Sequence, residues 1–328
     1  MLNLSLKTDR DKLEQLIADD VEQYCVELYG NENRNHLGAS ELGEQCWRKL
    51  YYKFRWFKKP SFDGRMLRLF NVGHTAEPRF ISYLRGIGFK IEEFEQDTLN
   101  YNPNDHSYFW SIGFKPEGLL ADVTKLEHHK LRASELGIKP KQFRISGAKG
   151  HYGGSLDAKA TAPERYMLET GLVLLGEFKT NNTGAGYAKV KTEDLSKSKP
   201  KHFAQMCQYG EKYGFKYGLY MIENKNDSEI TFRIIELDWN YGKSLERKAE
   251  EIIFAQEPPA RIAENESYYD CKYCDDFRGI CHRGEKPDKN CRTCRHSMPT
   301  ENATWTCSRY GLIPEDFIKT GCNDWLSI

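Results

Sequence analysis

Strand-like and helix-like patterns alternate between residues 142 and 256, and this alternation limits the fold more than any other feature of the sequence. The strand-like runs are rich in β-forming residues or bounded by glycine, whereas the helix-like runs repeat apolar residues every three or four positions. The strand-like runs are 142–147, 154–161, 172–180, 217–224 and 229–237, and the helix-like runs are 201–213 and 240–256. This order predicts an α/β fold, with a mixed central β-sheet flanked by helices.

The sequence on either side of this unit predicts further elements. Helices are expected at 8–29, 75–86 and near 122–136, strands at 88–95 and 108–114, and a loop at 181–200. The first helix should begin near Thr8 or Asp9, which are residue types that cap helices. Cys25 falls on the apolar stripe of that helix and is predicted to be a buried thiol.

A break in the pattern at residues 257–259, which read Glu-Pro-Pro, predicts a domain boundary. Seven of the ten cysteines lie beyond it, between Cys271 and Cys322. We therefore expect a main domain over residues 1–262 and a small cysteine-rich module over residues 263–328.

The net charge indicates no partner, because 48 basic side chains balance 48 acidic ones. A local patch is more informative: residues 47–70 contain eight Lys or Arg against one Asp, with aromatic residues between them. Such interleaving suits a nucleic-acid strand, since cations meet phosphates while rings stack on bases. It fits equally well an amphipathic helix with its rings in the core and its charges in solvent. The candidate strand contacts in this patch are Arg48, Lys53 and Arg55.

The composition points to a folded protein of the cytoplasm. Hydrophobic residues make up 39% of the chain and charged residues 29%, which is typical of a folded rather than a disordered chain. No apolar run approaches the roughly 20 residues of a membrane span, and the first residues lack the apolar core of a signal peptide. We expect no membrane partner.

The chemistry is concentrated in two of the strand-like runs, GGSLDAKA (153–160) and LLGEFKT (174–180). Because strand side chains alternate between faces, Glu177 and Lys179 should share a face while Phe178 points into the core. With Asp157 from a neighbouring strand, two carboxylates can hold a divalent cation beside a lysine. Hydrolysis of a phosphodiester uses such a set, and oxygen ligands favour Mg²⁺ or Mn²⁺ over Zn²⁺. The alternative is an ordinary surface network of salt bridges.

These motifs resemble those of the PD-(D/E)XK nuclease superfamily, especially its RecB-like and lambda-exonuclease-like (YqaJ) branches. Asp157 matches the Asp of the motif, and Glu177 and Lys179 match its Glu-x-Lys. In KPKHFAQMCQYG, Gln205 and Tyr209 are four residues apart and resemble the Gln-x-x-x-Tyr of RecB-like nucleases. This chain lacks the Pro that often precedes the first Asp.

An upstream segment, GHTAEPRF at 73–80, resembles the family's helix that supplies another metal ligand. Glu77 matches the lambda-exonuclease-like form of this helix, and His74 is the competing choice. The resemblance implies that Asp157, Glu177 and one of these two residues bind Mg²⁺ or Mn²⁺.

The resemblance also implies a restriction-endonuclease-like core and a function. Lys179 would orient or help activate the water, while Gln205 and Tyr209 would place the scissile phosphate. The expected activity is metal-dependent hydrolysis of single- or double-stranded DNA from its ends, in recombination, repair or processing in a bacterial or phage-infected cell, with a recombination or helicase protein as partner. An inactive nucleic-acid-binding adaptor of the same fold is the alternative. Further candidate DNA contacts are Lys197, Lys199 and Lys201.

The cysteines predict two structural metal sites. Cys291, Cys294, Cys307 and Cys322 make a sufficient tetrahedral thiolate set for Zn²⁺. The run CKYCDDFRGICH supplies three more thiols and a histidine, which are Cys271, Cys274, Cys281 and His282. In several RecB-like nucleases a similar run joins an N-terminal cysteine to hold a 4Fe-4S cluster, and this resemblance implies Cys46 as the fourth ligand. A second Zn²⁺ held with His282 is the alternative, and Cys25 and Cys207 remain as core thiols.

Overall fold

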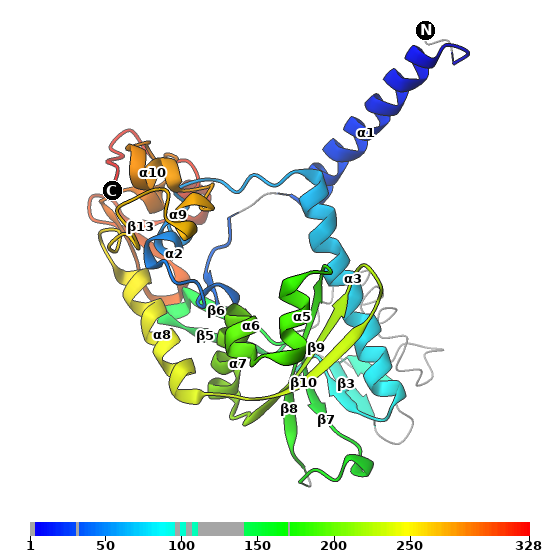
Figure 1. Cartoon of the computed structure of the whole chain (residues 1–328). Coiled ribbons are helices and arrows are strands. Elements are labelled where there is room, and N and C mark those ends of the chain that lie inside the picture. Colours follow the sequence, from blue (N-terminus) through cyan, green and yellow to red (C-terminus); the bar gives the residue numbers. More distant parts are fainter. Residues whose placement is uncertain (1–3, 31–32, 96–98, 103–106, 111–140, 170) are drawn as a thin grey trace.

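The computed structural model describes residues 4–30, 33–95, 99–102, 107–110, 141–169 and 171–328 (Figure 1). A five-stranded sheet forms its centre, in the order β10-β9-β8-β7-β2. The strands are β2 (Lys90–Glu92), β7 (Ala158–Thr161), β8 (Val173–Asn181), β9 (Tyr217–Asn224) and β10 (Ile230–Glu236). Strands β8 and β9 are parallel and the other pairs are antiparallel, so the sheet is mixed.

Helices cover both faces of this sheet (Figure 1). Helix α3 (Gly64–Gly86) packs on one face, where the ring of Phe80 meets the ring of Phe178. Helices α7 (Pro200–Tyr213) and α8 (Trp239–Phe254) lie on the other side and contact each other closely. A Cβ atom at Gly242 would stand 2.4 Å from the backbone oxygen of Cys207, so the contact requires glycine. The predicted α/β architecture with a mixed central sheet and flanking helices is confirmed.

Smaller elements surround the main sheet. A second sheet has the order β1-β6-β5, a third is the antiparallel meander β11-β12-β13, and β3 pairs with β4. Their strands are β1 (Leu37–Gly38), β3 (Leu99–Asn102), β4 (Ser107–Trp110), β5 (Arg144–Gly147), β6 (Tyr152–Ser155), β11 (Ser297–Pro299), β12 (Trp305–Cys307) and β13 (Gly311–Ile313). The remaining α-helices are α1 (Lys7–Tyr29), α2 (Trp47–Phe54), α5 (Ala185–Thr192), α6 (Leu195–Ser198), α9 (Tyr269–Lys272), α10 (Arg278–Arg283) and α11 (Glu315–Ile318). In the described part of the chain, no helix has the length and apolar character needed to cross a membrane.

Two buried arginines join the segment after α2 to the C-terminal part of the chain. Arg55 donates hydrogen bonds to the backbone oxygens of Arg292, at 3.0 Å, and Ala255, at 3.2 Å. Arg292 donates in return to the oxygen of Phe54 at 3.0 Å, and its guanidinium lies 4.8 Å from the ring centroid of Trp305. Arg55, at 1% exposure, is therefore internal, and its predicted contact with DNA is wrong because backbone carbonyls surround the guanidinium.

The N-terminal helix differs from its prediction in two ways. It begins at Lys7 after Leu6, and no side chain of the described residues caps it, so the expected cap at Thr8 or Asp9 is wrong. Cys25 is buried as predicted, because it rests against Gly64 of α3. The apolar stripe, by contrast, stays exposed, and its exposed members include Leu16, Ile17, Val21, Tyr24 and Leu28.

Other helices and strands also begin or end at residues different from those predicted. The expected loop at 181–200 contains α5 and α6, which form because Tyr187, Val190 and Leu195 are buried in the core. The expected strand 154–161 is divided at Asp157 into β6 and β7, which belong to different sheets. Helix α3 starts eleven residues before the expected residue 75, at Gly64. The predicted helix near 122–136 and the end of the strand at 108–114 lie outside the described residues.

Candidate active site

The register of the central sheet brings the predicted acids together. Ala158 of β7 pairs with Gly176 of β8 in an antiparallel ladder, which places Asp157 next to Glu177 just beyond the last pair. Lys179 forms an ion pair with Glu177, and its Nζ lies 3.7 Å from Oδ2 of Asp157. The backbone N–H of Phe178 donates to the same Oδ2 at 2.8 Å, which holds the Asp157 carboxylate against β8. Strand alternation thus puts Glu177 and Lys179 on one face of β8, and the β7–β8 register brings Asp157 beside them.

Glu177 is fully buried in the centre of this group, with an exposure of 0%. Burial raises the pKa of its carboxyl well above the usual range; Lys179 lowers it and Asp157 raises it further. The pKa of Lys179, which burial alone would lower, is raised by the Glu177 and Asp157 carboxylates. Among the described residues, the Glu177 carboxylate has no partner apart from Lys179, and its Oε2 is left unsatisfied. A buried carboxylate oxygen in this state fits a divalent cation as its missing partner.

Helix α7 presents the predicted Gln205 and Tyr209 to the same place. The side-chain amide of Gln205 donates to the Tyr209 hydroxyl at 3.2 Å, and both residues are buried. The pKa of Tyr209 is raised by burial and by the nearby Glu177 carboxylate. A Cβ atom at Gly154 would stand 2.6 Å from the Tyr209 hydroxyl, so the small residue leaves room for it.

Two further polar residues of the site were not predicted from the sequence. Tyr220 of β9 is the register partner of Glu177, and its hydroxyl lies 2.7 Å from Nδ1 of His202. Burial and the charges of Lys179 and Lys199 lower the pKa of His202 to about 3, so its imidazole is neutral near pH 7. Helical spacing from Gln205 could have indicated His202, whereas Tyr220 depends on the register between two strands.

A cavity of about 850 Å³, called the cleft below, opens beside these residues. Asp157 and Lys179 line it, and Glu77 and His74 of α3 line it as well. Glu77 is half-buried and His74 is exposed. Glu177 does not line the cleft but is buried behind Lys179. Both candidates for the additional ligand therefore face the same space as the Asp157 carboxylate.

The lining of the cleft carries more positive than negative side chains. Its cationic residues are Arg34, Lys53, Lys58, Lys59, Lys179 and Lys225, and its acidic residues are Glu41, Glu77, Asp157 and Asp276. This excess of positive charge favours an anionic ligand such as a nucleic-acid backbone. The net charge of the whole chain is zero and does not indicate this local excess.

The other predicted DNA contacts lie in different surroundings. Lys53 lines the cleft, where it forms an ion pair with Glu41 at 2.8 Å. Arg48 lies outside the cleft and donates to the backbone oxygen of Pro259 at 2.6 Å. Lys201 forms an ion pair with Glu44 at 2.8 Å. Lys197 is exposed, while Lys199 is half-buried, and burial lowers its pKa.

A second cavity, of about 250 Å³, gathers cysteines from both ends of the chain and is called the cysteine cavity below. It is lined by Cys46, Cys271, Cys274, Cys281 and also His282. Burial raises the pKa of the Cys271 and Cys274 thiols, and the nearby Cys46 adds to both shifts. Nε2 of His282 is buried and has no hydrogen-bond partner among the residues that the structure describes. Four thiols around one cavity are the donor set of a 4Fe-4S cluster, and the free nitrogen of His282 keeps the zinc alternative open.

The second cysteine set lies around the C-terminal meander. Burial raises the pKa of Cys291, and the neighbouring Cys322, Cys294 and Cys307 raise it further. These four thiols are the donor set that a structural Zn²⁺ requires. Among the described residues, no three His, Cys, Asp or Glu side chains converge closely enough to hold a single ion. Cys25 and Cys207 are buried, and neither lines the cysteine cavity.

No family model and no curated protein matches the sequence. Among solved structures, the chain is similar to that of SSO0001, with 16% identity over 82% of this chain and 97% of that chain and a TM-score of 0.41. It is also similar to the alkaline exonuclease LHK-Exo from Laribacter hongkongensis, with 15% identity, 67% and 87% coverage and a TM-score of 0.37. The structure of LHK-Exo in complex with dAMP gives 15% identity, 66% and 86% coverage and a TM-score of 0.36. These similarities are distant.

Proposed function

We propose that this protein is a divalent-metal-dependent DNA nuclease, which acts as an exonuclease from DNA ends in recombination, repair or processing. The observation that carries the proposal is the buried Glu177 carboxylate, whose Oε2 finds no hydrogen-bond partner in the part of the chain that the structure describes. Leaving such an oxygen unsatisfied is unfavourable, and the neighbouring Asp157 and Lys179 open onto a cleft with excess positive charge. A site for a cation beside a site for an anion is what phosphodiester hydrolysis requires.

The residues of the site take distinct roles. Asp157 and Glu177 would hold Mg²⁺ or Mn²⁺, with Glu77 as the third ligand and His74 as its alternative. When bound, the ion lowers the pKa of a water and offsets negative charge on the phosphate. Lys179 reaches the cleft with its ammonium beside both carboxylates, where it can orient the water and stabilise charge that develops on the phosphate.

Helix α7 supports this arrangement from inside the protein. Gln205 donates a hydrogen bond to the hydroxyl oxygen of Tyr209. The hydrogen of that hydroxyl remains available to donate to another acceptor. Together they would place the scissile phosphate. Tyr220, held by His202, would keep Glu177 in its position on the neighbouring strand.

The cysteine sites would be structural in this proposal. Cys46, Cys271, Cys274 and Cys281 would hold a 4Fe-4S cluster, because thiols spread around a cavity suit a group larger than one ion. Cys291, Cys294, Cys307 and Cys322 would hold Zn²⁺. A site closed by four protein ligands has no open position for substrate, so both would stabilise the C-terminal region against the main sheet.

The test is cleavage of end-labelled linear DNA, single- and double-stranded, with Mn²⁺, Mg²⁺ or EDTA. We expect progressive, metal-dependent shortening that Glu177→Gln abolishes. Glu229→Gln is a matched control, because it removes an acid that pairs with Lys191 outside the cleft. DNA binding without cleavage under every metal would contradict the nuclease and favour an adaptor.

A further inference from the structure

The carboxyl ends of β8 and β9 place one unassigned lysine at the cleft. These strands are parallel, and Lys225 is the first residue after β9. Its backbone N–H donates to the oxygen of Asn181 at 2.8 Å, at the end of β8. Asn181 is two residues beyond Lys179, which is about 7 Å along a strand. Ligands of open α/β sheets bind in the crevice outside the carboxyl ends of the strands.

Lys225 lines the cleft, and no side chain in the described part of the chain pairs with its ammonium. Lys225 is half-buried and lines the same cavity as Asp157 and Lys179. Within the described part of the chain it forms no ion pair or side-chain hydrogen bond, whereas Lys53 pairs with Glu41 and Lys191 with Glu229. A half-buried ammonium without a counter-charge in an electropositive cleft is suited to an anion of the ligand.

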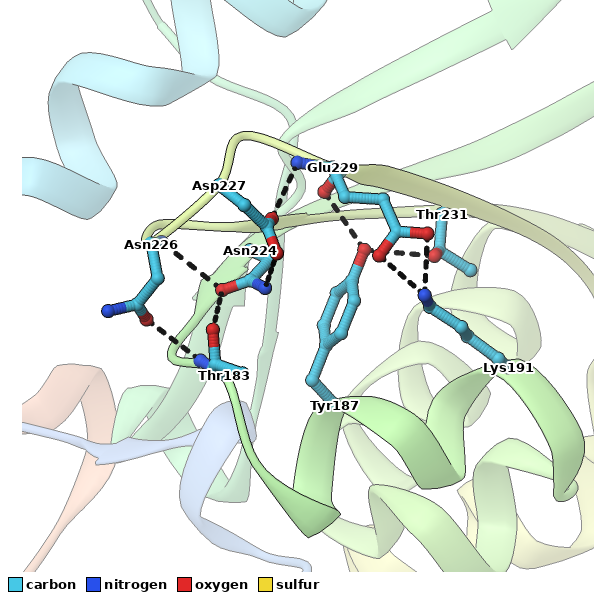
Figure 2. Close-up of polar contacts among 8 residues, drawn as sticks. All are labelled: Thr183, Tyr187, Lys191, Asn224, Asn226, Asp227, Glu229 and Thr231. Carbon is cyan, nitrogen blue, oxygen red and sulfur yellow. Dashed lines mark hydrogen bonds and ion pairs between the residues drawn. The ribbon is translucent and has the colours of Figure 1, made fainter.

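A polar network holds the backbone on which Lys225 sits (Figure 2). The hub is Asn224, which is 1% exposed. Its Oδ1 accepts from the Thr183 hydroxyl at 3.1 Å and from the backbone N–H of Asn226 at 3.2 Å, and its Nδ2 donates to Asp227 at 2.8 Å. Oδ1 of Asn226 accepts from the N–H of Thr183 at 2.8 Å. The β9–β10 turn is thereby fastened to the segment that leads from β8 into α5.

The same turn is also tied to the helix that carries Glu77. Glu223, one residue before Asn224, is 5% exposed and accepts two hydrogen bonds of 2.9 Å from Arg79 of α3. Arg79 is two residues from Glu77. The turn is thus held on two sides, by the end of β8 and by α3, so Lys225 has a defined position relative to the acids.

We propose that Lys225 binds a backbone phosphate of the DNA next to the scissile one, and that Asn224 is the positioning residue for it. This inference rests on the proposed function and assigns part of its substrate-binding surface. An ammonium binds phosphate as a point charge, so the contact is independent of base sequence.

The experiment measures the affinity of the whole protein for a labelled DNA duplex with a single-stranded end, in EDTA, across a series of salt concentrations. Losing one phosphate contact should lower the slope of log K against log salt by about 0.7 to 0.9, and weaken binding several-fold at low salt. We expect this for Lys225→Gln and recovery with Lys225→Arg. Lys191→Gln is the matched control, since Lys191 belongs to the same network but pairs with Glu229 outside the cleft.

A second variant tests the positioning role. Asn224→Ala should weaken binding and lower the slope in the same way, and it should add little to Lys225→Gln in the double variant, because both act on one contact. If the wild type binds and cleaves DNA but the variants have the same slope as the wild type, the assignment of Lys225 alone is overturned. Failure of the wild type to bind DNA at all would overturn the proposed function together with it.

Discussion

The cleft and the cysteine cavity bring distant residues together by different means. At the cleft, hydrogen-bonded ladders between β7, β8 and β9 place Asp157, which lines it, beside the buried Glu177 and Tyr220. In the cysteine cavity, Cys46 meets the Cys271–Cys281 run from the other end of the chain through side-chain packing. A ladder keeps its register without a ligand, whereas a cavity lined by thiols gains its folding energy from the group it holds. Loss of the ligand should therefore cost activity at the cleft and stability at the cysteine cavity.

The largest effect is expected at the cysteine cavity. Cys46→Ser should abolish the visible absorbance of anaerobically purified protein and lower the free energy of unfolding by several kcal/mol, because the binding free energy of a structural metal group contributes to folding. Visible spectra, iron and zinc analysis and urea unfolding check this. Cys207→Ser is a control, because that thiol lies on α7 and does not line the cysteine cavity. Colourless wild-type protein with about two zincs per chain would contradict the cluster and favour His282 as a ligand.

At the cleft, we expect loss of rate with the fold retained. Lys179→Ala should lower kcat by about 10²- to 10³-fold, since it removes a charge that is preorganised for the transition state. DNA affinity in EDTA should change far less, because several other cationic side chains line the cleft. Single-turnover cleavage and DNA-binding measurements separate the two effects. Equal cleavage by the variant and the wild type would remove Lys179 from the mechanism.

A smaller effect on kcat is expected at Tyr209, which is buried on helix α7 behind the cleft. Tyr209→Phe keeps the buried ring but removes the hydroxyl that accepts from Gln205. We expect kcat to fall about tenfold, and the free energy of unfolding by no more than about 1.5 kcal/mol, the net value of one hydrogen bond. Tyr213→Phe on the same helix should leave kcat unchanged, because its hydroxyl donates to the backbone of Arg144 instead. Similar kcat values for both variants would argue against a role for the Tyr209 hydroxyl.

The smallest effect concerns pH and the attachment of the C-terminal region. His151 packs edge-on against Trp305, and burial lowers its pKa, opposed by the carbonyl of Thr300 and reinforced by Arg292. The unfolded chain binds this proton near pH 6.5 and the folded chain only at lower pH. The free energy of unfolding should therefore decrease as the pH falls below about 6.5, by up to about 1.4 kcal/mol per pH unit.

Urea unfolding at pH 7.5 and 5.5 checks this expectation. His151→Gln should reduce the difference between the two pH values, whereas His74→Gln, at an exposed position, should not. A pH dependence that is the same in the wild type and both variants would assign the effect to other groups.

The order of elements and the grouping of the candidate site residues could be predicted from local patterns. Strand alternation places Glu177 and Lys179 on one face whatever the surrounding fold, and helical spacing does the same for Gln205 and Tyr209. Strand β9 has the predicted bounds for the same reason, since a continuous run of β-forming residues needs no partner to be recognised. These properties depend on spacing along the chain, and spacing is fully present in the sequence.

What the tertiary structure decided is which charges remain available. Arg55 and Lys225 are both cationic, and the sequence does not show which of them is buried. In the structure, backbone carbonyls surround the Arg55 guanidinium, whereas Lys225 lines the cleft. The helices in residues 181–200 form because Tyr187 and Val190 find a core to enter, which composition alone does not reveal. Burial, register and the meeting of the chain ends are relations between distant segments. The sequence therefore determined the residues of the candidate site, and only the packing of those segments decided which side chains line the cleft.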